Sequence, residues 1–112
     1  MSTNIVVEKS VDFSLEIIKF CETLEAARKY TVARQLLRSG TSIGANVFEA
    51  QHAESRADFI HKMKIASKEA NETFYWLLLC EKSDFYPKSG HLKNLAEELM
   101  KILSRIIFSA KN

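Results

Sequence analysis

Two carboxylate–histidine pairs lie close together near the middle of the chain. Glu49 precedes His52 by three residues, and Asp58 precedes His61 by the same interval. On helices this spacing places a carboxylate and an imidazole on one face, as in the di-metal sites of some four-helix bundles. The two pairs are nine residues apart across one turn, which would place them at the end of such a bundle rather than in its middle. The second pair also has Asp in place of Glu. We therefore expect surface histidines and capping carboxylates here, with no metal and no cofactor.

The candidate nucleophiles are also better explained as structural residues. Cys21 and Cys80 are far apart, and each lies within an apolar helical pattern, where a free cysteine behaves as a small hydrophobic residue. A disulfide or a reactive thiol is the alternative. The serines form no GxSxG motif, and no cysteine–histidine pattern with an orienting acid is present. The sequence predicts that the protein is not an enzyme.

Two glycines interrupt an otherwise helical segment. Gly40 and Gly44 lie one turn apart, and each costs about 1 kcal/mol relative to Ala inside a helix. A phosphate-binding loop would explain them, but the chain has neither a GxxxxGK(S/T) motif nor a preceding strand. The alternative is that they clear a groove into which another helix can move. We expect close helix packing.

The apolar periodicity predicts four helices that would position these residues. Apolar side chains recur every three or four positions within the ranges of about 10–27, 31–52, 55–82 and 90–109. Ser10 is expected to cap the first helix, and Ser55 with Asp58 resembles a capping box at the start of the third. Pro87 and Gly90 mark the break before the fourth. Short loops between long amphipathic helices indicate an all-α fold, in which residues 1–112 form a single antiparallel up-down-up-down four-helix bundle.

Composition agrees with one small globular domain. The chain has 112 residues, of which 46% are apolar and 27% charged, with 16 basic residues against 14 acidic ones. This balance is typical of a folded domain rather than of a disordered chain. No apolar run is long enough to span a membrane, and the first residues lack the basic and apolar regions of a secretory signal. We therefore expect a cytoplasmic protein without membrane contact.

The nearly neutral total conceals an uneven distribution of charge. Residues 1–27 carry a net charge of −3, residues 28–53 carry +3, residues 54–82 are neutral and residues 88–112 carry +3. The basic strips of the second and fourth helices comprise Arg28, Lys29, Arg34, Arg38, Lys93, Lys101 and Arg105. They are either solvated faces, with the acidic first helix beside the basic second one, or a nucleic-acid surface that oligomerisation would repeat.

A dense set of residues between positions 38 and 77 forms a recognisable pattern. It comprises Arg38-Ser39-Gly40-Thr41-Ser42-Ile43-Gly44-Ala45-Asn46, Glu49-Ala50, Ser55-Arg56, Asp58-Phe59, Lys62, Ile65-Ala66, Lys68-Glu69-Ala70, Glu72 and Tyr75-Trp76-Leu77. With this pattern the chain resembles the 23S ribosomal RNA intervening sequence proteins over nearly its whole length. The resemblance implies a four-helix bundle that assembles into a ring-like homopentamer. It implies no reaction, because the family name describes where some of the genes lie, within insertions in bacterial large-subunit ribosomal RNA genes.

A related protein extends what the resemblance implies about partners. The accessory variability determinant of diversity-generating retroelements is a basic pentamer that binds nucleic acid and its reverse transcriptase. By this likeness we expect a non-enzymatic oligomeric bundle that binds RNA or DNA. The alternative is a protein-only scaffold or adaptor for a nearby-encoded enzyme such as a reverse transcriptase. A metal-dependent bundle enzyme is a more remote third hypothesis.

Nine positions match the family pattern and are expected to act in structure or assembly, with direct ligand contact as the alternative. They are Ser42, Gly44, Asn46, Glu49, Arg56, Asp58, Lys62, Glu69 and Trp76. Those near the turn between the second and third helices can fix the hairpin through caps and charge-assisted hydrogen bonds. Ion pairs can form, on the helix surface or between subunits, between Lys62 and Glu69 and between Lys68 and Glu72. Because Tyr75 and Trp76 point about 100° apart on a helix, we expect a subunit interface there, with base stacking as the alternative.

Overall fold

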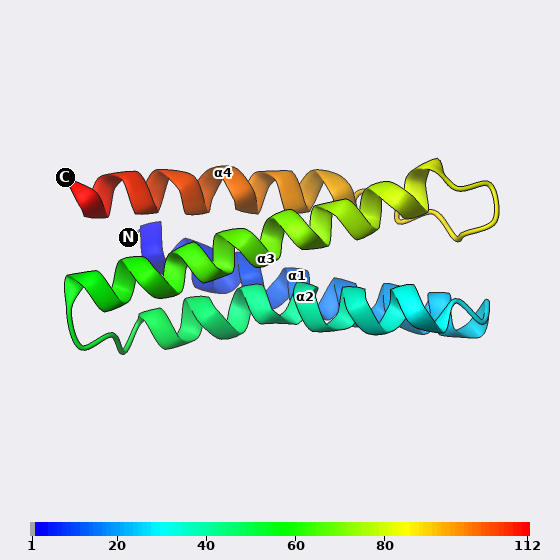
Figure 1. Cartoon of the computed structure of the whole chain (residues 1–112), viewed down its shortest axis with the longest axis horizontal. Helices are drawn as coiled ribbons and strands as arrows, with labels where there is room; N and C mark the ends of the chain where they lie inside the picture. The colour runs from blue at the N-terminus through cyan, green and yellow to red at the C-terminus, as the bar shows by residue number, and fades with distance from the viewer. Residues whose placement is uncertain (1) are drawn as a thin grey trace.

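Four helices account for almost the whole chain. The computed structural model describes residues 2–112, with side chains from Ile5 onward. The helices are α1 (Ser2–Ala26), α2 (Tyr30–Ala50), α3 (Arg56–Lys82) and α4 (Leu92–Lys111). They run alternately up and down along an axis 45 Å long, which is the predicted antiparallel four-helix bundle (Figure 1). Within residues 2–112, none of these helices has both the length and the apolar character needed to cross a membrane.

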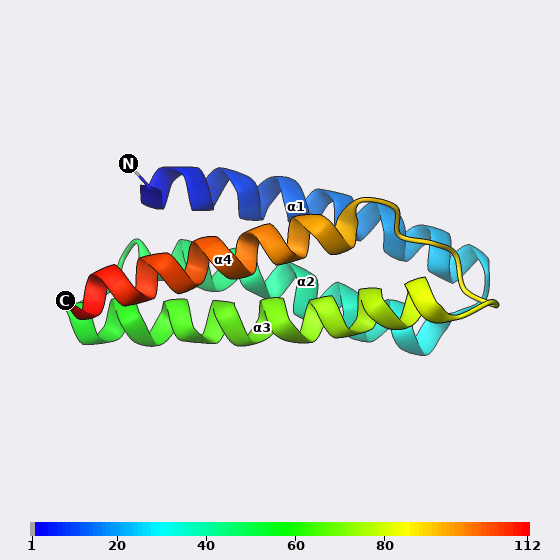
Figure 2. The same ribbon diagram turned by 90° about the horizontal axis from the view of Figure 1, so that it is seen from above.

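Each helix packs against its neighbours in the chain, and α1 also meets α4. Within residues 2–112, α1 is not in such contact with α3, nor α2 with α4, so these two pairs lie diagonally across the bundle. The antiparallel register is visible in contacts such as that between Glu49 of α2 and Lys62 of α3, and that between Lys9 of α1 and Glu98 of α4. Toward the end of the bundle that holds both termini, α1 and α4 diverge (Figure 2).

The two glycines of α2 allow this helix to approach α1 closely. A Cβ atom at Gly40 would lie 2.8 Å from Cγ2 of Ile17, and one at Gly44 would lie 3.3 Å from Oγ of Ser14. Both glycines are buried. The predicted close helix packing is confirmed, and it explains why this helix contains two residues of low helix propensity.

Apolar side chains from all four helices form one core. Its largest fully buried members include Phe13, Ile17, Leu24, Leu36, Ile43, Met63, Leu77, Leu99 and Leu103. Cys21 and Cys80 are free and buried in the same core, as the sequence predicts. Burial raises the pKa of Cys21 to about 12 and that of Cys80 to about 11, so both thiols stay protonated and unreactive at neutral pH.

The first helix begins earlier than the sequence predicts. It starts at Ser2, and Ser10 lies buried inside it with its hydroxyl donating to the carbonyl oxygen of Val7 at 3.0 Å. Val6 is fully buried and continues the apolar stripe toward the N-terminus. The prediction of an N-cap at Ser10 was wrong because a serine inside a helix can bond to a preceding carbonyl group. The other observed helix ends lie within two residues of the predicted ones.

Specific hydrogen bonds fix the turns at the two ends of the bundle. Oγ of Ser55 accepts a hydrogen bond from the N–H of Asp58 at 3.0 Å, and the Asp58 carboxylate accepts one from the N–H of Glu54 at 3.1 Å. The predicted cap of α3 is therefore confirmed. At the opposite end, Nζ of Lys88 donates to the carbonyl oxygens of Cys80, Glu81 and Ser83. These carbonyls form the C-terminus of α3, where the helix dipole favours a cation.

Candidate nucleic-acid interface

The seven cations predicted to bind nucleic acid occupy two separate surfaces. The first set lies in the α1–α2 loop and on α2, and the second lies on α4: Arg28, Lys29, Arg34 and Arg38, then Lys93, Lys101 and Arg105. Because α2 and α4 are diagonal in the bundle, Arg34 and Arg38 of α2 lie across the core from the three cations of α4. Nζ of Lys29 lies 4.9 Å from the centre of the Tyr86 ring, so this cation also holds the α3–α4 loop against the α1–α2 loop.

Arg38 is held between two carboxylates of α3. Its Nη2 donates to Oε1 of Glu72 at 2.7 Å, and its Nη1 lies 3.3 Å from Oε1 of Glu69. Oε2 of Glu72 accepts a hydrogen bond from Nε1 of Trp76 at 3.0 Å. The bonds from Trp76 and Arg38 lower the pKa of Glu72, and the bonds to Glu72 and Glu69 raise the pKa of Arg38. These four residues form the α2–α3 clamp, in which the arginine charge is neutralised within the chain.

A buried polar contact lies on the core side of the clamp. The hydroxyl of Thr73 is 3.0 Å from Oγ of Ser39 and 2.8 Å from the carbonyl oxygen of Glu69. Both Ser39 and Thr73 are fully buried. A satisfied polar pair in an apolar core fixes the relative position of the two helices that carry it.

Most of the residues that match the family pattern bind other parts of the chain. Oγ of Ser42 donates to the carbonyl oxygen of Arg38 at 2.6 Å, and Nδ2 of Asn46 donates to the carbonyl oxygen of Ser42 at 2.9 Å. Nζ of Lys62 lies 2.9 Å from Oε1 of Glu49, which raises the pKa of the lysine. Gly44, Asp58, Glu69 and Trp76 have the packing, capping and clamp roles described above, and Arg56 is the exposed first residue of α3.

Within the described part of one chain, neither ion pair predicted for α3 forms along the helix surface, and their formation between subunits stays a prediction. Glu69 and Glu72 pair across to Arg38 of α2, and Lys62 pairs with Glu49. Lys62 and Glu69 are two turns apart, a rise of about 10 Å, which is too far for a direct contact along the helix. Lys68 instead lines a groove on the side of α3 that faces α4.

The carboxylates of the two carboxylate–histidine pairs have partners within the chain. Glu49 binds Lys62, and Asp58 caps α3. In the part of the chain whose side chains are described, no three His, Cys, Asp or Glu residues come together in a group that could hold a metal ion. The carboxylates at these positions therefore serve the α2–α3 turn.

A basic groove lies between α3 and α4. It has a volume of about 410 Å³ and is lined by Lys64, Ser67, Lys68, Ser104, Ile107, Phe108 and Lys111. Of these residues three are lysines and none is acidic, and the Phe108 side chain is 70% exposed. Among residues 5–112, no carboxylate lies within ion-pair distance of these lysines. This α3–α4 groove has the chemistry to bind an anionic ligand that also offers a flat face for stacking.

Two of the predicted cations on α4 extend the charge of this groove. Lys101 is exposed and lies three residues before Ser104, hence on a neighbouring part of the same helix face. Nζ of Lys93 lies 5.9 Å from the centre of the Phe74 ring, at the junction of α3 and α4. Arg105, by contrast, lines a different pocket, at the end of the bundle.

The α3–α4 groove is hidden in the sequence when charge is summed along the chain. Residues 54–82 are neutral in total, but Glu69 and Glu72 face α2 whereas Lys64 and Lys68 face α4. Part of the signal is present in the sequence. Two lysines four residues apart share one helix face, but the same spacing also links Lys68 to Glu72, so only the packing of α3 between α2 and α4 separates the lysines from the carboxylates.

Large apolar side chains are exposed on the outer faces of α1 and α2. Their exposed fractions lie between 39% and 59%, and they include Val11, Leu15 and Ile18 on α1, and Leu37 and Phe48 on α2. The spacing of four and three residues on α1 places the first three on one face. On α3, Tyr75 is 53% exposed and its neighbour Trp76 is half-buried, and the two rings meet edge to face with their centroids 5.3 Å apart.

Comparisons with known proteins agree with this architecture. The sequence family described as 23S rRNA-intervening sequence protein matches residues 2–105. A crystal structure of a protein with unknown function, from the S23 ribosomal protein family of Bacteroides thetaiotaomicron VPI-5482, is similar with a TM-score of 0.90. The two sequences are 43% identical, and the similarity covers 96% of this chain and 99% of that one. Comparison with curated proteins gives no match.

Proposed function

The chain belongs to the 23S rRNA-intervening sequence protein family, and from this premise we propose that it is a non-enzymatic, oligomeric bundle that binds RNA in the α3–α4 groove. The observation that carries this proposal is the composition of the groove, whose described lining has three lysines, an exposed phenylalanine and no acidic residue. Lysine ammonium groups bind phosphates as point charges, and an exposed aromatic ring can stack on an unpaired base.

The other groups of the groove fit the same ligand. The hydroxyls of Ser67 and Ser104 line it from opposite helices and can bond to phosphate or ribose oxygens. Along α4, the distance from Lys101 to Lys111 is about 15 Å at 1.5 Å per residue. The groove therefore suits a short segment of a single strand, and its recognition rests on backbone charge and stacking rather than on base edges.

The exposed apolar residues of α1 and α2 support self-association. Val11, Leu15 and Ile18 share one face of α1, and the neighbouring helix α2 exposes Leu37 and Phe48. Exposed apolar patches on small domains mark interaction surfaces. Contact through α1 and α2 leaves the α3–α4 groove open on every copy, and a closed ring would repeat the groove around its axis.

Sedimentation equilibrium tests the assembly. The resemblance to the family implies five copies of the 12.8 kDa chain, and we expect that mass for the wild type. Leu15→Glu places a charge at the 59% exposed centre of the α1 patch and is expected to lower the mass without unfolding the chain. A monomer at micromolar concentration would contradict an oligomer.

A salt titration tests RNA binding. We expect a short fluorescein-labelled single-stranded RNA to bind at low salt, with the logarithm of the association constant falling linearly with the logarithm of salt concentration. Replacing Lys64 and Lys68 together by Gln removes two phosphate contacts and is expected to reduce the slope by about 1.4. Lys19→Gln is the matched control, because Lys19 is an exposed lysine on α1, diagonal to α3.

The contrary outcomes are distinct. If the wild type binds no RNA even at low salt, the proposed function is wrong, and a protein-only scaffold becomes the better hypothesis. If RNA binds but the double variant keeps the wild-type slope, RNA binds elsewhere, and the cations of the α1–α2 loop and α2 are the next surface to vary.

A further inference from the structure

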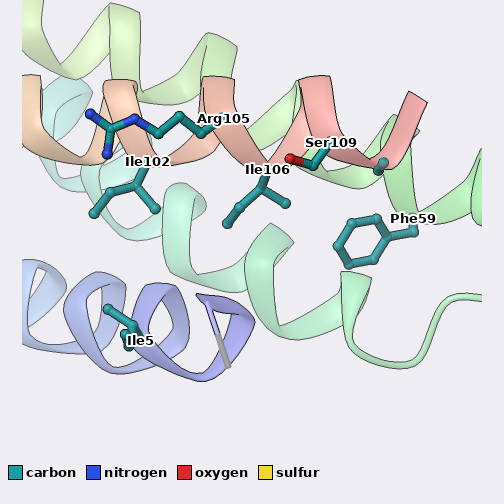
Figure 3. Close-up of a pocket in the computed structure, with 7 residues that line it drawn as sticks. Ile5, Phe59, Ile102, Arg105, Ile106 and Ser109 are labelled. Atoms are coloured by element: carbon teal, nitrogen blue, oxygen red, sulfur yellow. The ribbon is translucent and has the colours of Figure 1, made fainter. Parts of the chain in front are cut away.

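A second concavity lies at the end of the bundle that holds both termini. It has a volume of about 500 Å³ and opens between α1, α3 and α4, where α1 and α4 diverge (Figure 3). It is lined by Ile5, Phe59, Ile102, Arg105, Ile106, Ser109 and Ala110. Five of these residues are apolar, so the pocket combines an apolar body with two polar groups, both from α4.

The walls of this terminal pocket come from three different helices. Ile106, which is only 8% exposed, projects from α4 toward the interior, and Phe59 of α3 borders one end (Figure 3). Ile5 of α1 lies across the opening from Ile102 of α4 (Figure 3). One turn beyond these two isoleucines, α1 and α4 are joined by the Lys9–Glu98 ion pair at 3.4 Å. The apolar channel therefore has limited length, with an aromatic ring at one end and an ion pair at the other.

Charge distinguishes the ligands that this pocket could accept. The single charged group among its described lining residues is the guanidinium of Arg105, which extends along α4 beside Ile102 (Figure 3). Among residues 5–112, no carboxylate lies within ion-pair distance of that guanidinium. The volume of the terminal pocket lies within the range of about 300–1,000 Å³ that is usual for small-molecule sites, which are mostly apolar with a few polar groups.

We propose that the terminal pocket binds a small amphiphilic carboxylate of the medium-chain fatty acid type. The aliphatic chain lies between Ile5 and Ile102 and reaches toward Phe59, and the carboxylate binds Arg105 at the rim. A cationic amphiphile is disfavoured because its head group would meet the arginine. An uncharged alcohol of the same length gains the apolar contacts but not the charge-assisted hydrogen bond.

Isothermal titration calorimetry with decanoate below its micelle concentration tests the proposal. We expect saturable binding of one decanoate per chain, weaker binding of decanol and no saturable binding of decyltrimethylammonium. Between hexanoate and decanoate, each added methylene is expected to tighten binding about fourfold, the factor that corresponds to ~0.8 kcal/mol. These comparisons separate a defined pocket from general detergent-like binding.

Variants locate the ligand. Ile102→Trp fills the pocket and is expected to abolish saturable decanoate binding, and Ile5→Trp at the 52% exposed rim provides a second test should the first variant fail to fold. Arg105→Gln is expected to weaken decanoate about fivefold while leaving decanol unchanged. Lys101→Gln is the matched control, because Lys101 is an exposed cation on the same helix outside the pocket lining, and it should leave both affinities unchanged.

Three results would overturn the proposal. The first is an absence of saturable decanoate binding to the folded wild type, and the second is unchanged binding by a folded tryptophan variant. The third is a wild type that binds no decanoate together with a tryptophan variant whose oligomeric mass differs from that of the wild type. That combination identifies a second copy of the chain as the occupant of the pocket.

Discussion

The contact surface between α2 and α3 (the α2–α3 seam) and the one between α1 and α4 (the α1–α4 seam) are held together by different interactions. Between α2 and α3 lie the clamp around Arg38, the Lys62–Glu49 pair and the buried contact of Ser39 with Thr73. The α1–α4 seam has Lys9–Glu98 at 3.4 Å and His91–Glu16 at 4.0 Å, and it borders pockets of about 500 and 400 Å³. The residues of the family pattern lie mainly on the α2–α3 seam. The pattern therefore describes how the α2–α3 hairpin is held together, whereas the two pockets lie beside the contact between α1 and α4.

A matched pair of leucine truncations is expected to show the largest difference between the seams. Leu77 of α3 is fully buried in the core, whereas Leu95 of α4 is half-buried and lines the 400 Å³ pocket. We expect Leu77→Ala to lower the free energy of unfolding by about 3 kcal/mol and Leu95→Ala by about 1 kcal/mol. Urea denaturation followed by circular dichroism measures both. Equal losses would show that the α1–α4 seam is as well packed as the core.

The buried hydroxyl contact is expected to have the next largest effect. Thr73→Val keeps the shape of the side chain but leaves Oγ of Ser39 without this partner in the core, which should cost about 1–2 kcal/mol of stability. Thr41→Val is the control, because Thr41 is only partly buried and bonds to the carbonyl oxygen of Leu37 within its own helix. Urea midpoints of the two variants compare them directly. A smaller loss for Thr73→Val than for Thr41→Val would contradict a pinning role for the buried pair.

Removal of one cation from each seam should give smaller effects. Arg38→Gln leaves Glu69 and Glu72 close together without their shared partner and is expected to cost about 1 kcal/mol. Lys9→Gln removes an exposed pair at 3.4 Å and should cost less than about 0.5 kcal/mol. Thermal unfolding at low and high salt provides the measurement, since screening should reduce both costs. If Lys9→Gln is the more harmful change, the contrast between the two ionic contacts is wrong.

The α2–α3 clamp is also expected to make stability depend weakly on pH. The pKa of Glu72 is lowered from 4.5, chiefly by the hydrogen bond from Trp76 and then by that from Arg38. Because the folded pKa lies below the unfolded one, the ionised carboxylate stabilises the protein above the unfolded pKa. This stabilisation is lost as the pH falls through the folded pKa.

Stability measured against pH checks this expectation. Glu72→Gln should be less stable than the wild type near neutral pH, by less than about 1 kcal/mol for a partly exposed group, and the difference should shrink in acid. Glu97→Gln, on the exposed side of α4, is the control and should show no such convergence. A difference that stays constant from neutral to acidic pH would assign the effect of Glu72→Gln to something other than its charge.

The fold could be predicted from the sequence because apolar periodicity and turn residues act locally. The capping box at Ser55 and the break at Pro87 each depend on a few neighbouring residues, and the spacing of Gly40 and Gly44 that predicts close packing lies within one segment; the structure contains all three features. The early start of α1 was missed because the same serine chemistry caps a helix end or bonds inside a helix. Burial of Val6 decides between the two, and burial depends on the other helices.

The candidate sites were harder to predict because they depend on which helix faces which. Arg38 was placed in a free basic strip, but its position opposite Glu69 and Glu72 follows from the α2–α3 register. In a sum of charge along the chain, the positive charges of Lys64 and Lys68 cancel the negative charges of those two glutamates, although the lysines and the glutamates face different helices. The terminal pocket depends on the divergence of α1 from α4, which no local pattern encodes.

The connection between α1 and α4 also has a consequence for the order in which the bundle folds. Lys9 and Glu98 are separated by 89 positions, whereas Glu49 and Lys62 are separated by 13. Closing the longer loop costs roughly 1.7 kcal/mol more in chain entropy. The contacts between α1 and α4 that offset this cost are fewer than those between α2 and α3. The α2–α3 hairpin should therefore form first and α1 should dock onto α4 last. In native-state hydrogen exchange, amides near the N-terminus of α1 should open by fluctuations that leave the α2–α3 hairpin folded.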